Sequence, residues 1–212
     1  MYFTTNDDVR IFYEDSAPSG GASDLTLVLI HGWSGSHRAF KHNFEPLSQH
    51  ARVIAFDLRG HGASDKPSHG LHVARLALDL HNLLTHLALP SPPVLLGTSL
   101  GSALIWSLLE LFPASARAAI FVDQAPLQNV KPDGTWRTQG SKGIFDAAST
   151  GFVLGQLVAN PSAFHAGTPA ACMGRAPTEA EIGFFGAIAG EASVEALCEI
   201  MGDHTGLDWR KG

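Results

Sequence analysis

The chain carries at residues 94–101 the sequence Val94-Leu95-Leu96-Gly97-Thr98-Ser99-Leu100-Gly101, and a mostly apolar segment follows to residue 112. The apolar run before Gly97 predicts a buried strand, and the longer segment after it predicts a helix. Ser99 would then occupy a sharp strand-to-helix turn, which needs a small residue two positions before it and two after it. Such a turn exposes the serine hydroxyl beside a helix N-terminus that stabilises developing negative charge. Ser99 is therefore the candidate nucleophile, and the competing interpretation is a turn serine without chemistry.

Similar apolar runs on both sides of this stretch predict further strands. They lie at residues 25–30, 53–56 and 118–122, and helical segments at about 36–50, 73–89 and 100–112 separate them. Alternation at residues 8–13 predicts a strand in an opening hairpin, and Pro18-Ser19-Gly20-Gly21 predicts a turn or loop. Strand and helix alternate from residue 25 to 122, which favours an α/β fold with a mostly parallel sheet covered by helices on both faces.

The helix expected at residues 73–89 has one apolar face, which we expect to pack on the sheet. This face carries Val73, Leu76, Leu80, Leu83, Leu84 and Leu87. The opposite side carries Arg75, Asp79 and Asn82. The pattern therefore predicts that Asp79 points away from the core.

Length and composition favour a single globular domain. The chain has 212 residues, of which 45% are hydrophobic and 16% charged. Its net charge of -6 and the lack of a basic run argue against nucleic acid as a partner. Two cysteines are too few for a disulfide framework, and neither a leader sequence nor a membrane-spanning segment is evident. We therefore expect a soluble cytoplasmic protein that does not bind membranes.

The alternation of predicted strands and helices ends after residue 122. Lys131-Pro132-Asp133-Gly134 predicts a turn, and Ala- and Gly-rich helical stretches continue to about residue 201 without a clear buried strand. We expect a core at residues 1–126 that bears the Ser99 turn, followed by a helical cap-like region at residues 127–212. Five aromatic side chains suggest an apolar pocket, with a place in the hydrophobic core as the alternative: Trp33, Phe121, Trp136, Phe145 and Phe152.

Two polar motifs follow the first two of these buried runs. The first is His31-Gly32-Trp33, where the N–H of Trp33 is expected to form an oxyanion hole with the N–H of Leu100. We expect His31 to hold this loop by a hydrogen bond and not to act as a base. The second motif is Asp57-Leu58-Arg59-Gly60-His61-Gly62-Ala63-Ser64-Asp65. We interpret it as a structural loop in which Asp57, Arg59 and Asp65 hold one another in place.

The three motifs, in this order and spacing, resemble the α/β-hydrolase fold superfamily. The likeness is closest to the branch that contains small esterases and cofactor-free haloperoxidases, and residues 122–126 look like the end of that fold's sixth strand. The resemblance implies acyl transfer by a serine. Epoxide hydrolases and haloalkane dehalogenases of this fold carry aspartate at the turn, so Ser99 disfavours their chemistry.

A serine nucleophile needs a base oriented by a carboxylate. The resemblance implies the chain order serine, acid, histidine, and only His165 and His204 follow Ser99. Asp123 is the one acid in a plausible position, with a strand-end or pocket-lining role as the alternative. His204 would reach the pocket only if the cap folds over it, and the other reading is a histidine that packs within the cap.

The family fold would continue through two more strand-helix units that carry the acid and the histidine. We therefore expect the chain to be truncated before those strands, with an uncovered sheet edge that would cause poor solubility or dimerisation through that edge. No nucleotide loop and no metal-ligand spacing is present, so no cofactor and no metal is expected.

The sequence thus favours a serine hydrolase that acts on a small ester, lactone or thioester. A biosynthetic pathway of secondary metabolites is one setting in which such an enzyme would act. Perhydrolysis, carbon–carbon bond hydrolysis and acyl transfer remain open. The alternative of a different class is a catalytically impaired hydrolase-fold protein that serves as a binding or interaction module.

Overall fold

The computed structural model describes residues 1–16, 24–129 and 145–210. Six strands form one sheet: β1 (Tyr2–Thr4), β2 (Arg10–Asp15), β3 (Thr26–Ile30), β4 (Arg52–Phe56), β5 (Val94–Thr98) and β6 (Ala118–Val122). The α-helices of the described residues are α1 (Lys41–Ser48), α2 (Val73–Leu87), α3 (Leu100–Leu111), α4 (Ala147–Ala159), α5 (Pro161–Cys172), α6 (Glu179–Ala189) and α7 (Val194–Gly206). Short 3-10 helices lie at His37–Phe40 and Pro113–Ser115.

The strand order in the sheet is β1-β2-β4-β3-β5-β6. The four strands from β3 to β6 are parallel to their neighbours, and β1 and β2 add an antiparallel hairpin at one end. This arrangement confirms the predicted α/β class and its mostly parallel sheet. The turns expected at residues 18–21 and 131–134, and Trp136, lie outside the described residues.

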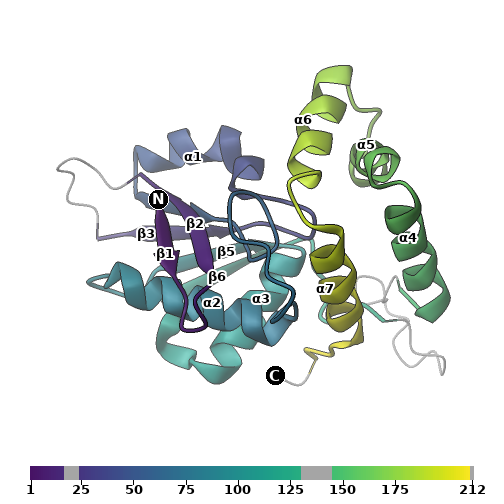
Figure 1. Ribbon diagram of the computed structural model, residues 1–212. Helices are drawn as coiled ribbons and strands as arrows, with labels where there is room; N and C mark the ends of the chain where they lie inside the picture. Colours follow the sequence, from purple (N-terminus) through teal and green to yellow (C-terminus); the bar gives the residue numbers. More distant parts are fainter. Residues whose placement is uncertain (17–23, 130–144, 211–212) are drawn as a thin grey trace.

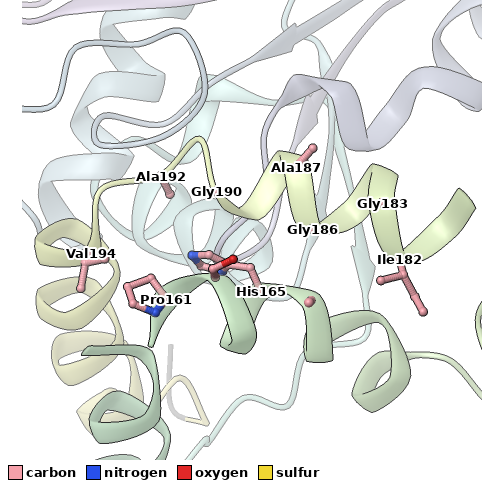
Figure 2. A pocket seen from close by; sticks show the side chains of 11 residues that line it. Pro161, His165, Ile182, Gly183, Gly186, Ala187, Gly190, Ala192 and Val194 are labelled. Carbon is pink, nitrogen blue, oxygen red and sulfur yellow. The ribbon is translucent and has the colours of Figure 1, made fainter. Parts of the chain in front are cut away.

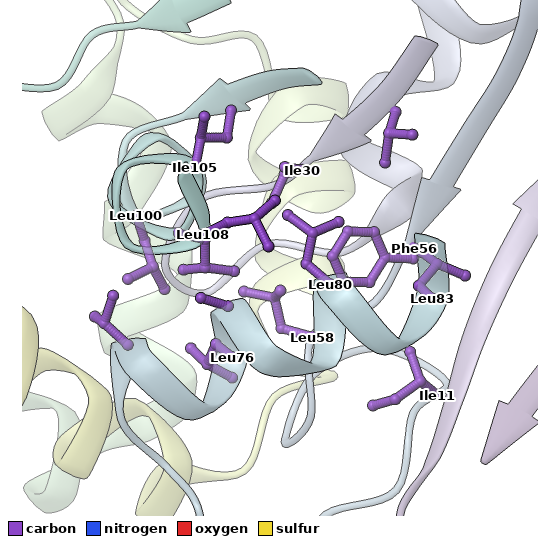
Figure 3. Packing of buried hydrophobic residues seen from close by; sticks show 14 of the residues in the cluster. Ile11, Ile30, Phe56, Leu58, Leu76, Leu80, Leu83, Leu100, Ile105 and Leu108 are labelled. Atoms are coloured by element: carbon purple, nitrogen blue, oxygen red, sulfur yellow. The ribbon is translucent and has the colours of Figure 1, made fainter. Parts of the chain in front are cut away.

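Helices cover both faces of the sheet, with α1 on one face and α2 and α3 on the other (Figure 1). The larger hydrophobic cluster lies beneath α2 and α3, where Leu76 and Leu80 pack with Ile30, Phe56 and Leu108 (Figure 3). A smaller cluster beneath α1 contains Leu29, Phe40, Val53 and Ala55. Apolar side chains on both faces of the central strands explain why these strands appear in the sequence as almost continuous apolar runs.

Asp79 is the clear exception to the amphipathic pattern of α2. Its side chain is 1% exposed, and both carboxylate oxygens accept hydrogen bonds from the Arg59 guanidinium, at 2.6 and 2.7 Å. The prediction that Asp79 points away from the core was therefore wrong. A charged side chain is buried only when it is paired, and its partner here lies 20 residues away in the sequence, where helical periodicity cannot reveal it.

Helices α4 to α7 follow the last strand and lie together at one side of the sheet (Figure 1). Helix α7 is tied to the core at both ends: the N–H of Ser193 donates to the Gly60 carbonyl at 2.8 Å, and the Asp203 carboxylate accepts from the N–H of Val73 at 2.8 Å. A Cβ on Gly60 would stand 2.4 Å from the Cβ of Ala196, so only glycine allows this approach. Packing against the core thus places α7 close to the ends of the parallel strands.

Strand β6 forms the outer edge of the sheet in the described part of the chain. Three consecutive apolar residues on it are solvent-exposed: Ile120 at 45%, Phe121 at 42% and Val122 at 41%. Among the described helices, none combines the length and the apolar character needed to cross a lipid bilayer.

Candidate active site

Ser99 occupies the turn between β5 and α3, at the N-cap of the helix. Its backbone angles are φ 49° and ψ −119°, a conformation that side-chain-bearing residues rarely adopt. The turn is held by two backbone hydrogen bonds, from the Ser99 N–H to the Val122 carbonyl at 2.9 Å and from the Ser102 N–H to the Ser99 carbonyl at 2.8 Å. The strained backbone therefore places the Ser99 side chain just before the first turn of α3 and not within the helix.

The two glycines of the motif are required by close backbone contacts. A Cβ on Gly97 would stand 2.4 Å from the carbonyl carbon of Gly101, and a Cβ on Gly101 would stand 2.4 Å from the Ile30 carbonyl oxygen. Both distances are shorter than any real Cβ contact. The glycines thus allow α3 to begin directly against the ends of β5 and β3.

The loop after β3 passes beside this turn. The N–H of Leu58 donates to His31 Nε2 at 3.1 Å, so Nδ1 carries the imidazole hydrogen and donates to the Gly32 carbonyl at 2.8 Å. Both ring nitrogens of His31 are therefore occupied. Burial lowers the pKa of His31, which is fully enclosed, and the imidazole stays neutral. His31 thus acts as a fixed support for the loop that carries Gly32 and Trp33.

Two backbone N–H groups near Ser99 have no protein acceptor in the described part of the chain. They belong to Trp33, in the loop after β3, and to Leu100, the first residue of α3. The indole Nε1 of Trp33 donates to the Leu197 carbonyl at 2.9 Å, and its ring meets that of Phe164 edge-on. The Trp33 side chain therefore joins the loop to helices α5 and α7.

A cavity of about 860 Å³ opens above Ser99. The core contributes Gly32, Trp33, Ser34, Ser99 and Asp123 to its walls, and helices α4, α5 and α7 contribute most of the remainder. Of the five aromatic residues expected at a pocket, Trp33, Phe145 and Phe152 line this cavity. Phe121 does not line it; its ring stacks on Trp106 at 5.2 Å between centroids. The cavity size lies in the upper part of the usual range for small-molecule sites.

His204 and Asp123 line the same cavity as Ser99. His204, in the last turn of α7, is 4% exposed, and its Nδ1 has no hydrogen-bond partner among the described residues. Burial lowers the pKa of His204 to about 4, so the imidazole is neutral at pH 7. Asp123 follows β6 with φ 52°. No hydrogen bond joins the side chains of Ser99, His204 and Asp123 in the described structure, so the three share one cavity without forming a connected triad.

His165 faces a different space. It lies on α5, 5% exposed, and lines a separate cavity of about 490 Å³ between α5 and α6 (Figure 2). Ala163, Phe164 and Gly167 on the other side of the same helix line the Ser99 cavity. Helix α5 therefore separates His165 from Ser99, which leaves His204 as the described histidine downstream of Ser99 that lines its cavity.

The loop at residues 57–65 has a structural role, as expected. The side chains of its charged residues do not bind one another, however, and the expectation that they would was wrong. The Asp57 carboxylate accepts from the His37 backbone N–H at 2.6 Å, from the His37 imidazole at 2.8 Å and from the Ala63 N–H at 2.8 Å. Burial opposes ionisation of Asp57, yet its hydrogen bonds with His37 lower its pKa.

The other two charged residues of this loop have partners elsewhere. Arg59 binds Asp79 and Asp7, and Asp65 pairs with Arg10. Because the turn between β1 and β2, strand β2 and helix α2 supply these partners, spacing within the loop could not identify them.

One wall of the Ser99 cavity could not be predicted from the sequence. Ala163, Gly167 and Ala171 repeat every four residues on α5 and face the cavity. Small residues at this spacing are common in closely packed helices, so the spacing alone does not indicate a cavity wall.

A family model for the alpha/beta hydrolase fold matches residues 26–174. A non-heme chloroperoxidase of Streptomyces lividans is 33% identical over 131 residues, an alignment that covers 61% of this chain and 46% of that protein. An esterase from Exiguobacterium antarcticum matches the structure with a TM-score of 0.86 and 22% identity, over 100% of this chain and 75% of that one. A bromoperoxidase from Bacillus anthracis matches with a TM-score of 0.83 and 23% identity, over 100% and 76%. The chain thus spans about half the length of the curated relative.

Proposed function

The chain belongs to the α/β-hydrolase fold family, and on this basis we propose that it is a serine hydrolase that cleaves small esters, lactones or thioesters through an acyl-enzyme. The observation that carries the proposal is Ser99 itself. Its strained turn holds it at the start of α3, on the wall of a cavity of about 860 Å³. Strain of this kind persists only where the surrounding structure imposes it, and it clusters at reactive positions.

In the proposed reaction, Ser99 Oγ attacks the carbonyl carbon of the substrate and loses its proton to a base. The carbonyl oxygen becomes an oxyanion, which the N–H groups of Trp33 and Leu100 would bind, since neither has a protein acceptor in the described residues. The tetrahedral intermediate expels the alcohol or thiol, which takes the proton, and leaves an acyl-Ser99. Water then attacks the acyl group, a proton passes back to Ser99 Oγ, and the free acid departs.

We propose His204 as the base and Asp123 as the carboxylate that supports it. Both line the cavity of Ser99, and the unpartnered Nδ1 of His204 is free to bind a proton or a carboxylate. The low pKa of His204 means that it needs an anion nearby to become an effective base at neutral pH, and Asp123 is the ionisable carboxyl group among the described lining residues.

The test is labelling by a fluorophosphonate, which reacts only with an activated serine. We expect labelling of the wild-type chain and none of Ser99→Ala. Ser162→Ala is the matched control, because Ser162 is an exposed serine on the side of α5 that faces away from Ser99. His204→Gln is expected to reduce the labelling rate at least about a hundredfold if His204 is the base. A folded wild-type chain that stays unlabelled would instead support the alternative, a hydrolase-fold protein that binds ligands in this cavity without turning them over.

We also propose that two copies of the chain associate through β6. Exposed strand edges present unpaired N–H and C=O groups to other chains. Here, three consecutive exposed apolar side chains accompany that edge.

A further inference from the structure

Helix α5 forms one long wall of the Ser99 cavity. Its lining residues follow a helical period along its whole length: Ala163, Phe164, Gly167, Thr168, Ala171 and Cys172, with Asn160 at the start. Phe164 meets Trp33 of the Ser99 loop at 6.0 Å between ring centroids, so this end of the wall is next to the site of reaction. Ala171 and Cys172, at the other end of the wall, line the same cavity.

Three positions on this wall carry almost no side chain. Ala163, Gly167 and Ala171 are four residues apart, and eight residues of helix span about 12 Å. A Cβ built on Gly167 would meet no other atom within 4 Å. The middle of the wall is therefore open, and a narrow chain can lie along it for this distance.

The charges around the cavity favour an uncharged ligand. Among the described lining residues there is no lysine or arginine, and Asp123 is the one carboxylate. His204 is neutral because burial lowers its pKa to about 4. An anionic ligand would therefore meet Asp123 without a cation to balance it. Phe145, Phe152, Val153 and Met201 make much of the rest apolar.

We propose that the site takes uncharged esters whose linear acyl chain has about six to ten carbons, and that Gly167 sets the chain length accepted. The length follows from the open wall of about 12 Å, since a C–C bond of about 1.5 Å advances a zigzag chain by about 1.3 Å per carbon. The proposal rests on the proposed function for its acyl group. The acyl chain is the part that must stay bound through the acyl-enzyme, whereas the alcohol leaves after the first step.

The first experiment measures kcat/KM for the p-nitrophenyl esters of acetate, butyrate, hexanoate, octanoate and decanoate. We expect kcat/KM to rise about tenfold for every two carbons added up to octanoate, because each step buries two more methylenes. Gly167→Leu should remove the gain in kcat/KM beyond butyrate. Gly155→Leu is the matched control, because Gly155 is a helical glycine of α4 with nothing within 4 Å of its Cβ and does not line the cavity.

Several outcomes would overturn the proposal. They are a wild-type preference for acetate, the same profile in Gly167→Leu as in wild type, or a length preference that appears with alkyl acetates instead of p-nitrophenyl esters. Equal rates for the p-nitrophenyl ester of butyrate and the anionic monoester of succinate would overturn the preference for uncharged substrates.

A binding measurement keeps the proposal independent of turnover. Ser99→Ala is titrated by calorimetry with octanamide, butyramide and octanoate. We expect octanamide to bind at least about tenfold more tightly than either of the others, and Gly167→Leu in the same background to abolish this difference. If binding follows this pattern while the wild-type chain is neither labelled nor active, the proposed catalysis fails and the proposed ligand class stands. Equal binding of the three compounds would overturn the ligand class itself.

Discussion

Gly32 lies directly against Ser99: a Cβ on Gly32 would stand 3.3 Å from the Cβ of Ser99 and 3.2 Å from the carbonyl oxygen of Thr98. The loop after β3 and the turn after β5 thus pack with no room for one extra methyl group. Because the N–H groups of Trp33 and Leu100 belong to these two segments, their spacing depends on this contact.

Gly32→Ala is predicted to impair the chemistry more than the fold. The added methyl group would push the loop away by a few tenths of an ångström and misplace the N–H of Trp33. We expect the rate of fluorophosphonate labelling at Ser99 to fall about tenfold to a hundredfold. The control is Gly202→Ala on α7, where a Cβ meets nothing within 4 Å. Labelling of Gly32→Ala at the rate of the control would show that this contact does not position the proposed oxyanion hole.

The buried pair of Arg59 and Asp79 is predicted to be among the most sensitive points for stability. Arg59 is fully buried, so Asp79→Asn leaves a cation without its closest anion and should lower the free energy of unfolding by about 3–5 kcal/mol. Urea unfolding measures this change. Glu191→Gln breaks the partly exposed pair with Arg38 and should cost less than about 1 kcal/mol. Equal effects of the two substitutions would contradict the importance of burial.

Stability is predicted to fall on the acid side because of buried imidazoles. Burial lowers the pKa of His61 to about 3, against an ordinary value of 6.5, and its ring lies 5.2 Å from that of His31. Below pH 6.5 the unfolded chain binds a proton at His61 and the folded chain does not. The free energy of unfolding is therefore unaffected by His61 above pH 6.5 and falls by up to about 1.4 kcal/mol per pH unit down to about pH 3.

Urea unfolding at pH 7, 6 and 5 tests this dependence. His61→Leu should reduce the slope of the free energy of unfolding against pH by the contribution of about one proton, even if the variant is less stable at every pH. An unchanged slope would mean that His61 is protonated in the folded state.

Self-association through β6 is predicted to depend on its exposed apolar side chains. Light scattering at increasing concentration should give a mass that rises towards that of a dimer, and Ile120→Lys should keep the chain monomeric. Leu111→Lys is the comparison, because Leu111 is a similarly exposed apolar residue at the end of α3 and not on the edge strand. A monomeric wild-type chain at all concentrations would contradict the proposed association.

Much of the fold could be predicted because its signals lie in consecutive residues. The apolar runs at residues 25–30, 53–56 and 118–122 coincide closely with β3, β4 and β6, and the predicted helix at 73–89 coincides with α2. Strand and helix formation depend on local periodicity and on the burial of each face, which a short window already contains. The turn at Ser99 was visible for the same reason, since the contact between Gly97 and Gly101 arises within the motif. The contact that requires glycine at position 101 comes from Ile30 on β3.

Two predictions failed because the partner is distant in the sequence. Asp79 was assigned to the outer side of α2 because it lies opposite the apolar face of the helix, yet Arg59 from the loop after β4 meets it in the core. Asp57, Arg59 and Asp65 were expected to bind one another, and each instead binds a group from another element. The choice among alternative partners depends on how the elements pack.

The sequence alone was sufficient for the α/β class, the order of the elements and the serine at the turn, because steric limits and hydrophobic periodicity act between near neighbours. The packing of α7 against the core and of α5 against α4 and α6 settled the rest. It turns His204 towards the Ser99 cavity and His165 away from it, and it aligns Ala163, Gly167 and Ala171 along one wall. Such relationships arise only when segments far apart in the chain bury surface against each other, and no local pattern encodes which faces will meet.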